Sequence, residues 1–252
     1  MEFNNIKSKF PIFKQKIKGK PLIYLDSANS SQKPKIVIDE ISRFYETEFS
    51  NVGRSVHTLA VKATNKFEET RDIVKSYINA KNREEIIFTK GATEAINLIA
   101  STYGEKFIKA GDEILVTELE HHSNYVPWHY LRKKKGAIIK FANVNENGEV
   151  DIDEFKKKIT EKTKIIAFTH ISNVTGTIMP VKKIIELAKS KNIPVLIDGT
   201  QGAPHSVIDV QDLDCDFYAI SCHKMYGPNG LGILYAKKNG LMSYHPIKEV
   251  VG

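Results

Sequence analysis

From about Lys81 onward, short apolar segments alternate with amphipathic helical patterns, and this alternation limits the folds open to the chain. Short strands joined by such helices predict an α/β fold with a mostly parallel sheet sandwiched by helices. The predicted strands span 85–89, 113–117, 137–141, 164–169, 193–197, 217–221 and 232–236, and the predicted helices span 93–103, 123–135, 152–158 and 181–191.

The first 80 residues follow a different pattern. Helices are predicted over 34–49 and 64–79 with a loop over 50–57 between them, and a short amphipathic helix is predicted over 3–18. We interpret residues 1–80 as an N-terminal helical arm and residues 81–252 as an α/β domain on which the arm packs.

Composition narrows the classes of function. The chain has 252 residues, of which 41% are hydrophobic, so it can form a sizeable core. Its net charge of +7 comes mostly from lysines on predicted helix faces, without interleaved aromatic residues, which disfavours nucleic-acid binding. No apolar stretch reaches the length of a membrane span, and two cysteines do not form a disulfide framework. We expect a cytoplasmic protein, or an organellar one if a targeting peptide has been removed.

The most informative chemistry surrounds Lys224, which follows a predicted strand within the segment 221–228. A lysine preceded by a hydroxyl and an imidazole suits an amine that forms an imine beside a phosphate group. Asp198 ends another predicted strand, where a carboxylate suits the ring nitrogen of a pyridine. Pyridoxal 5'-phosphate (PLP) has these two requirements. On residue type alone, Lys224 could be a surface lysine and Asp198 a turn or capping residue.

A phosphate cradle is predicted beside this lysine, because the ligand site of a parallel sheet lies beyond the carboxyl ends of its strands. Ala92 and Thr93 lie at the start of a predicted helix, where backbone N–H groups and a hydroxyl bind anions. Ser221 and His223 would add donors from the lysine loop. An ordinary capped helix start has the same local pattern.

Two histidines, His121 and His122, follow the strand predicted over 113–117. A metal site is disfavoured because adjacent histidines rarely face the same way and no third ligand has suitable spacing. We expect the His121 ring to stack on a planar cofactor and His122 to lie at the surface. Gln201 and Asn173 also follow predicted strands; they could hydrogen-bond to the cofactor, or be loop and turn residues.

The chain carries an ordered set of motifs. They are YLDSA at 24–28, SQKP at 31–34, VHTL at 56–59, TEAINL at 93–98, EHHSN at 120–124, VPW at 126–128, SNV at 172–174, GT at 176–177, DGTQ at 198–201, LDCDFY at 213–218 and HKMYGP at 223–228. With these motifs the chain resembles the group II, Suf-type cysteine desulfurases. That group belongs to the class V aminotransferase superfamily of fold-type I PLP enzymes, and the resemblance spans nearly the whole chain.

The resemblance implies a PLP-dependent transferase-like fold and a role for each candidate residue. Lys224 would hold PLP covalently, Asp198 would pair with the pyridinium nitrogen, and Gln201 would contact the phenolate oxygen. Lys224 and His121 would be the catalytic residues, with His121 stacked on the ring. The remaining members of the site would be the phosphate-binding Thr93, Ser221, His223 and backbone of Ala92, and Asn173 near cofactor and substrate.

The resemblance also implies the reaction. Members of the family remove sulfur from L-cysteine, producing L-alanine and an enzyme persulfide for iron–sulfur cluster assembly. A scaffold or carrier protein accepts the sulfur, and the enzyme is a homodimer with its sites at the subunit interface. Sister activities, selenocysteine lyase or another class V aminotransferase reaction, remain open.

Three departures from the family pattern affect this expectation. Gly53 replaces a histidine often found before Arg54, and Cys222 replaces a small residue, usually glycine, beside His223. The chain ends at Gly252, whereas family members continue into a domain that holds the persulfide-forming cysteine and a substrate-binding arginine. We therefore expect the cofactor machinery without the nucleophile, either in a fragment of a longer protein or in a degenerate product. An inactive fragment that acts only as a binding subunit is the alternative.

Overall fold

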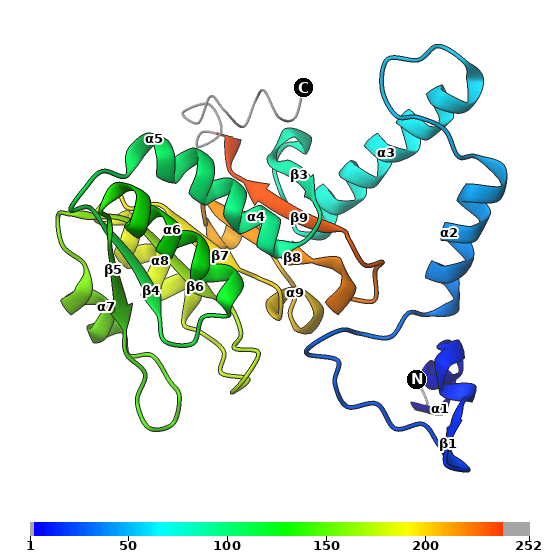
Figure 1. Ribbon diagram of the computed structural model, residues 1–252, viewed down its shortest axis with the longest axis horizontal. Helices are drawn as coiled ribbons and strands as arrows, with labels where there is room; N and C mark the ends of the chain where they lie inside the picture. Colours follow the sequence, from blue (N-terminus) through cyan, green and yellow to red (C-terminus); the bar gives the residue numbers. More distant parts are fainter. Residues whose placement is uncertain (1–2, 239–252) are drawn as a thin grey trace.

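The computed structural model describes residues 3–238 (Figure 1). Residues 1, 2 and 239–252 lie outside the described residues. The predicted start of the arm at residue 1 and the predicted end of the domain at residue 252 therefore also lie outside them. The division of the chain at residue 80 stays a prediction.

A seven-stranded sheet with the order β3-β9-β8-β7-β6-β4-β5 forms the centre of the fold. Strand β9 runs antiparallel to β3 and β8, and the other neighbouring pairs are parallel. Each predicted strand is present within two residues of its expected bounds, so the mostly parallel α/β fold is confirmed. The bounds are β3 Ile86–Thr89, β4 Glu113–Thr117, β5 Ile138–Ala142, β6 Thr163–Thr169, β7 Val195–Asp198, β8 Phe217–Ser221 and β9 Gly232–Ala236.

The helices between these strands also follow the predicted positions. The stretch predicted over 93–103 consists of α4 and a π-helical turn, and α5 follows directly beyond its predicted end. The stretch predicted over 123–135 begins with a 3-10 turn before α6. Gly136 ends α6 with a left-handed φ of 75°, which glycine adopts without steric cost. The bounds are α4 Ala92–Ile99, α5 Glu105–Phe107, α6 Val126–Lys135, α7 Ile152–Lys158, α8 Val181–Lys189, and the unpredicted short helices α9 Gly202–His205 and α10 Val210–Leu213.

Two apolar cores lie on opposite faces of the sheet, because side chains along a strand alternate between its faces. On β7, Val195 and Ile197 belong to one core and Leu196 to the other. Ile184 of α8 packs in the first core, and Ile96 of α4 packs in the second. In Figure 1, α4 and α6 lie on the same side of the sheet. Cover on both faces explains why central strands such as β7 and β8 are buried along their whole length.

The N-terminal helices differ from the prediction in their starts. Helix α2 (Lys35–Thr47) lies within the predicted 34–49, but α3 (Thr58–Tyr77) begins at residue 58 rather than 64. The side chain of His57 accepts a hydrogen bond from the backbone nitrogen of Ala60 at 3.3 Å and caps this earlier turn. Satisfying one unpaired N–H group stabilises the first turn of a helix.

The single helix predicted over 3–18 is wrong. Helix α1 (Phe3–Ser8) ends before Pro11, and a 3-10 turn over Pro11–Lys14 follows it. Proline lacks an N–H group and its ring clashes with the preceding turn, so an α-helix cannot continue through it. A short antiparallel pair, β1 (Lys16–Ile17) and β2 (Lys20–Pro21), completes the region.

The chain between β2 and α2 returns to the sheet, whereas α2 projects away from it (Figure 1). None of the residues of α2 is buried. The returning segment is anchored by the backbone nitrogen of Ser31, which donates to the carbonyl of His223 at 3.0 Å. Within residues 3–238, no helix combines the length and apolar character that a bilayer crossing requires.

The carboxyl ends of the central strands meet at one edge, because β4, β6, β7 and β8 run in the same direction. Strand β9 fixes the start of α4 at this edge. A Cβ atom on Gly232 would collide with the backbone of Gly91, the residue before α4, so the absence of a side chain permits this close approach.

Candidate active site

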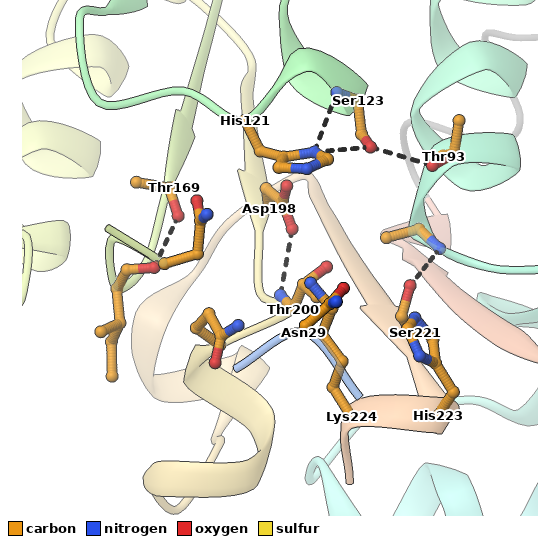
Figure 2. A pocket seen from close by; sticks show the side chains of 14 residues that line it. Asn29, Thr93, His121, Ser123, Thr169, Asp198, Thr200, Ser221, His223 and Lys224 are labelled. Atoms are coloured by element: carbon orange, nitrogen blue, oxygen red, sulfur yellow. Dashed lines mark hydrogen bonds between the residues drawn. The ribbon is translucent and has the colours of Figure 1, made fainter. Parts of the chain in front are cut away.

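A cavity of about 190 Å³ lies at the carboxyl ends of the strands (Figure 2). Fourteen residues line it, and all nine predicted site residues are among them. The nine are Ala92, Thr93, His121, Asn173, Asp198, Gln201, Ser221, His223 and Lys224. The other five are Asn29, Ser123, Thr169, Ile171 and Thr200. The fold therefore brings residues from six separate segments of the chain into one cavity.

Lys224 enters the cavity from the 3-10 turn Cys222–Lys224, which directly follows β8. Burial lowers the pKa of its amine below the usual value, and the negative charge of Asp198 acts in the opposite direction. A lower pKa increases the fraction of neutral amine, which is the form that attacks a carbonyl.

Asp198 is held rigidly at the end of β7. Its side chain is 4% exposed, and Oδ1 accepts a hydrogen bond from the backbone nitrogen of Thr200 at 3.0 Å. The next residue is Gly199, where a Cβ atom would collide with the ring of Tyr218. The turn after β7 is thus packed directly on a buried aromatic ring. Figure 2 shows the carboxylate of Asp198 beneath the ring of His121.

A cluster of donors surrounds the start of α4. The hydroxyl of Ser221 lies 2.8 Å from the backbone nitrogen of Ala92, and the Thr93 hydroxyl lies 2.9 Å from that of Ser123. The unpaired N–H groups of a helix start favour an anion, and hydroxyl groups can donate to the same anion. This part of the cavity can therefore hold a phosphate group.

His121 is fixed by Ser123. The Nδ1 atom lies 3.1 Å from the backbone nitrogen and 2.8 Å from the hydroxyl of Ser123. Because a backbone N–H donates to Nδ1, this nitrogen carries no proton and the neutral ring is protonated at Nε2. Burial, followed by the charge of Lys224, lowers the pKa of His121 and favours this neutral form. The ring of His122 stands at 88° to that of His121.

Glu120, directly before His121, holds the ends of two strands together. Its carboxylate accepts hydrogen bonds from the side chain of Asn124 at 2.6 Å and from the backbone nitrogen of Thr169 at 3.0 Å. The Thr117 hydroxyl also donates to it. Burial raises the pKa of the Glu120 carboxyl to about 8, although these three donors favour the ionised form.

Gln201 contacts a part of the chain that the sequence patterns did not connect to it. Its side-chain nitrogen donates to the carbonyl of Ala28 at 2.6 Å. The predicted contact of Gln201 with a cofactor oxygen stays a prediction. Asn173 lines the cavity from the loop after β6, and Asn29 lines it from the returning N-terminal segment.

The residues missed by the prediction had weak sequence signals. Ser123 and Thr200 lie inside the motifs EHHSN and DGTQ, Asn29 directly follows the motif YLDSA, and Thr169 ends a predicted strand, but the residue types alone assign none of them a role. Thr200 is the most informative of them. Within the described part of the chain, its hydroxyl is the one buried side-chain polar atom that has no hydrogen-bond partner. Buried polar groups are normally paired, so this hydroxyl indicates that a polar ligand belongs in the cavity.

The residues present fit PLP. A partly buried lysine, a rigid buried carboxylate and an anion-binding helix start line one cavity, together with the unpaired Thr200 hydroxyl. These groups match the aldehyde, the pyridine nitrogen and the phosphate of PLP. Among residues 3–238, no three His, Cys, Asp or Glu side chains are grouped as metal ligands would be.

The fold and this site define a transferase-like protein of the PLP-dependent class. The chain belongs to the class-V aminotransferase family, because the model of that family, described as "Aminotransferase class-V", matches residues 23–250. This membership confirms the superfamily that the motifs predicted, and members of this family depend on PLP.

Individual relatives agree with this assignment. A probable cysteine desulfurase of Halalkalibacterium halodurans is 48% identical over 248 residues, which cover 98% of this chain and 61% of that protein. The cysteine desulfurase structure from Thermococcus onnurineus NA1 matches with a TM-score of 0.88 at 36% identity, over 95% of this chain and 58% of that one. The Escherichia coli cysteine desulfurase CsdA matches with a TM-score of 0.84 at 37% identity, over 96% and 59% of the two chains. The chain thus spans about 60% of the length of these relatives.

Proposed function

We propose that this chain supplies the cofactor-binding part of a PLP-dependent cysteine desulfurase. In the proposed reaction, L-cysteine is converted to L-alanine while its sulfur passes to an enzyme cysteine as a persulfide. The observation that carries the proposal is the placement of Lys224, Asp198 and the start of α4 around one cavity. The 48% identity to a probable cysteine desulfurase supports this choice among PLP reactions.

The side chains of the cavity have distinct tasks in this proposal. When bound, PLP supplies an electron sink for the substrate α-carbon. Lys224 would hold it covalently, and the buried carboxylate of Asp198 would keep its ring nitrogen protonated. Side chains of Thr93, Ser221 and His223 would bind the phosphate. Ala92 would assist through its backbone N–H, which donates to the Ser221 hydroxyl at 2.8 Å and leaves the proton of that hydroxyl for the phosphate. Gln201 and Asn173 donate hydrogen bonds to cofactor or substrate.

Proton transfer at the α-carbon is assigned to Lys224. A general base must be neutral before it accepts a proton, and burial of Lys224 lowers the pKa of its amine in the required direction. His121 would stack on the cofactor ring as a neutral imidazole, held by the Ser123 contacts to Nδ1. The Nε2–H of His121 faces away from Ser123 and remains free to donate to the substrate.

We propose that the persulfide-forming cysteine lies outside residues 1–252. The sequence contains Cys215 and Cys222, and both are buried. Burial raises the pKa of Cys222 to about 11 and raises that of Cys215 further. Because the thiolate is the nucleophile, neither thiol is prepared for attack on a substrate sulfur.

The finer assignments rest on the motifs EHHSN and VPW and on the relatives. They are the Suf-type subgroup, a homodimer, a sulfur-acceptor protein of iron–sulfur cluster assembly and a cytoplasmic location. Selenocysteine lyase activity is the competing assignment for the same cavity.

Borohydride reduction tests the cofactor site. The purified protein is incubated with PLP and reduced, and the modified peptide is mapped by mass spectrometry. A single adduct on Lys224, absent from Lys224→Ala and retained in the surface variant Lys182→Ala, supports the proposal. A folded protein that forms no adduct, or forms it elsewhere, contradicts it.

Product analysis then separates the candidate reactions. The full-length protein is supplied with L-cysteine, L-selenocysteine or an amino acid with a keto-acid acceptor, and alanine is measured. Alanine and persulfide sulfur from L-cysteine support the desulfurase. Alanine from L-selenocysteine alone supports the lyase, and transamination alone supports an aminotransferase.

A further inference from the structure

The segment 28–33 bridges two walls of the cavity. At one end, the carbonyl of Ala28 accepts a hydrogen bond from Gln201, which follows β7. At the other end, Ser31 and Lys33 contact the loop after β8 that carries Lys224. Figure 1 shows this part of the chain returning to the sheet from the N-terminal region. The two strand-end loops are therefore tied to each other through residues far away in the sequence.

Several donors of segment 28–33 converge on one atom, the carbonyl oxygen of His223. The backbone nitrogen and the hydroxyl of Ser31 each lie 3.0 Å from it, and Nζ of Lys33 lies 2.9 Å from it. The Ser30 hydroxyl lies 3.4 Å from the same oxygen. A carbonyl oxygen has two lone pairs, so the His223 oxygen has at least as many donors around it as it can accept hydrogen bonds from. The peptide that joins His223 to Lys224 is thereby fixed in orientation.

Ser31 also fixes the chain on the far side of Lys224. Its hydroxyl accepts a hydrogen bond from the backbone nitrogen of Tyr226 at 2.8 Å. Tyr226 has a φ of 69°, a left-handed conformation that is uncommon for a tyrosine and needs support from its surroundings. The backbone on both sides of Lys224 is thus held by segment 28–33.

Lys33 supplies the charge in this arrangement. Its ammonium group donates to the carbonyl of Ser31 at 2.7 Å as well as to that of His223. Hydrogen bonds from a charged donor are about twice as strong as neutral ones. Lys33 is half-buried, yet it is not among the fourteen residues that line the cavity. Its action on the site therefore passes through the backbone beside Lys224.

We propose that Lys33 is a positioning residue for Lys224. Together with Ser31, it holds the backbone of residues 223–226 so that the Lys224 amine points into the cavity in the orientation that bonding to PLP requires. This inference rests on the proposed function for its consequence in catalysis. The mechanical part, a backbone held by Lys33, does not depend on PLP.

Hydrogen exchange tests the mechanical part in the PLP-free protein. Lys33→Met keeps the aliphatic part of the side chain and removes the charge. In this variant the amides of residues 222–227 should exchange about tenfold faster, because losing a charge-assisted hydrogen bond makes local opening of the backbone at least that much more frequent. Lys35→Met is the matched control, because Lys35 is exposed and pairs with Asp39 in α2. Lys33→Arg keeps a charged donor and should restore most of the protection. Unchanged exchange in Lys33→Met, or an equal increase throughout the chain, overturns the proposal.

The rate of covalent bonding tests the consequence for Lys224. Borohydride-trapped adduct is measured against time over a range of PLP concentrations. The maximal rate should fall about tenfold in Lys33→Met, because orientation of the reacting amine is lost. The PLP concentration for half-maximal rate should stay within about twofold, because Lys33 does not line the cavity. Failure of the proposed function and failure of the Lys33 proposal give different results. If the wild-type protein forms no adduct, the proposed function is wrong. If Lys33→Met forms the adduct at the wild-type rate, only the role of Lys33 is wrong.

Discussion

The hydroxyl of Ser221 accepts a hydrogen bond from the backbone nitrogen of Ala92 at 2.8 Å. This contact joins the end of β8 to the start of α4 across 129 positions of sequence. It places a hydroxyl and the free N–H groups of a helix start at the same edge of the cavity, where both can contact one anion. In the proposed function, the phosphate end of the site would be assembled from these two distant segments.

Ser221→Ala removes the hydroxyl from this edge, and with it the acceptor of the hydrogen bond from the Ala92 backbone N–H. We expect PLP to bind about tenfold more weakly, since a hydrogen bond to a charged group contributes about 1.5–3 kcal/mol. Absorbance titration of the protein with PLP measures the change. Ser101→Ala is the control, because Ser101 is exposed in the π-helical turn and its hydroxyl bonds within its own helix. Equal PLP affinities for Ser221→Ala and wild type would remove Ser221 from the phosphate site.

Gly232→Ala tests the close approach of β9 to the start of α4. The added methyl group would collide with the backbone of Gly91, which cannot move without displacing Ala92. We expect a loss of about 1–3 kcal/mol in the free energy of unfolding, as for other overpacked positions, and weaker PLP binding. Urea denaturation and PLP titration measure the two effects.

Gly230→Ala separates crowding from backbone strain. Gly230 has a φ of 73° with open space around it, so this variant carries only the cost of a left-handed alanine, about 1–2 kcal/mol. Its PLP affinity should be unchanged. If Gly232→Ala also binds PLP normally, the close approach does not position the helix start.

The sheet could be predicted because its strands are buried on both faces. The strand at 217–221, for example, is hydrophobic up to Ile220 and ends at the polar Ser221, so its end is visible in the sequence. Parallel strands place their carboxyl ends at one edge, and this rule alone gathers Lys224, Asp198, His121 and Thr93 into one region. The cavity lined by all nine predicted residues follows from that geometry.

The contacts of segment 28–33 could not be predicted in the same way. Ala28 and Gln201 are 173 residues apart, and Ser31 and His223 are 192 apart, with no periodic pattern connecting them. The start of α3 was missed because His57 is an unusual capping residue. By contrast, the break at Pro11 was readable, since proline excludes a continuous helix over 3–18.

Tyr218→Phe tests the support beneath the turn that carries Asp198. The Tyr218 hydroxyl lies 2.8 Å from Nδ1 of His170, and both residues are buried. Phenylalanine keeps the ring beneath Gly199 but leaves the His170 nitrogen without this partner. We expect a loss of about 1–3 kcal/mol in the free energy of unfolding, the usual cost of an unpaired buried polar group. Tyr130→Phe, at an exposed position of α6, should change stability little, and an equally small effect for Tyr218→Phe would show that the pair contributes nothing.

Glu120→Gln tests the buried carboxyl that joins the ends of β4 and β6. Burial raises its folded-state pKa to about 8 from the ordinary value of 4.5. Between these two pH values the unfolded chain is ionised at this residue while the folded chain holds the proton. Stability from this group is therefore complete below about pH 4.5 and is lost as the pH rises towards about 8. The wild-type protein should lose up to about 1.4 kcal/mol per pH unit across this window through Glu120.

Urea denaturation of wild type and Glu120→Gln across this window isolates the contribution of Glu120 from that of the histidines, which both proteins retain. The stability of wild type relative to the variant should decrease as the pH rises. In Glu120→Gln, the NH₂ group of the glutamine would face the side-chain nitrogen of Asn124, which donates to Glu120 in the wild type. Two donors then oppose each other, so the variant should be less stable than the wild type near pH 4.5. Glu118→Gln changes an exposed carboxyl in the same loop and should run parallel to wild type. If the difference between wild type and Glu120→Gln stays constant with pH, the three donors to this carboxylate outweigh its burial, and Glu120 holds the two strand ends together as an anion.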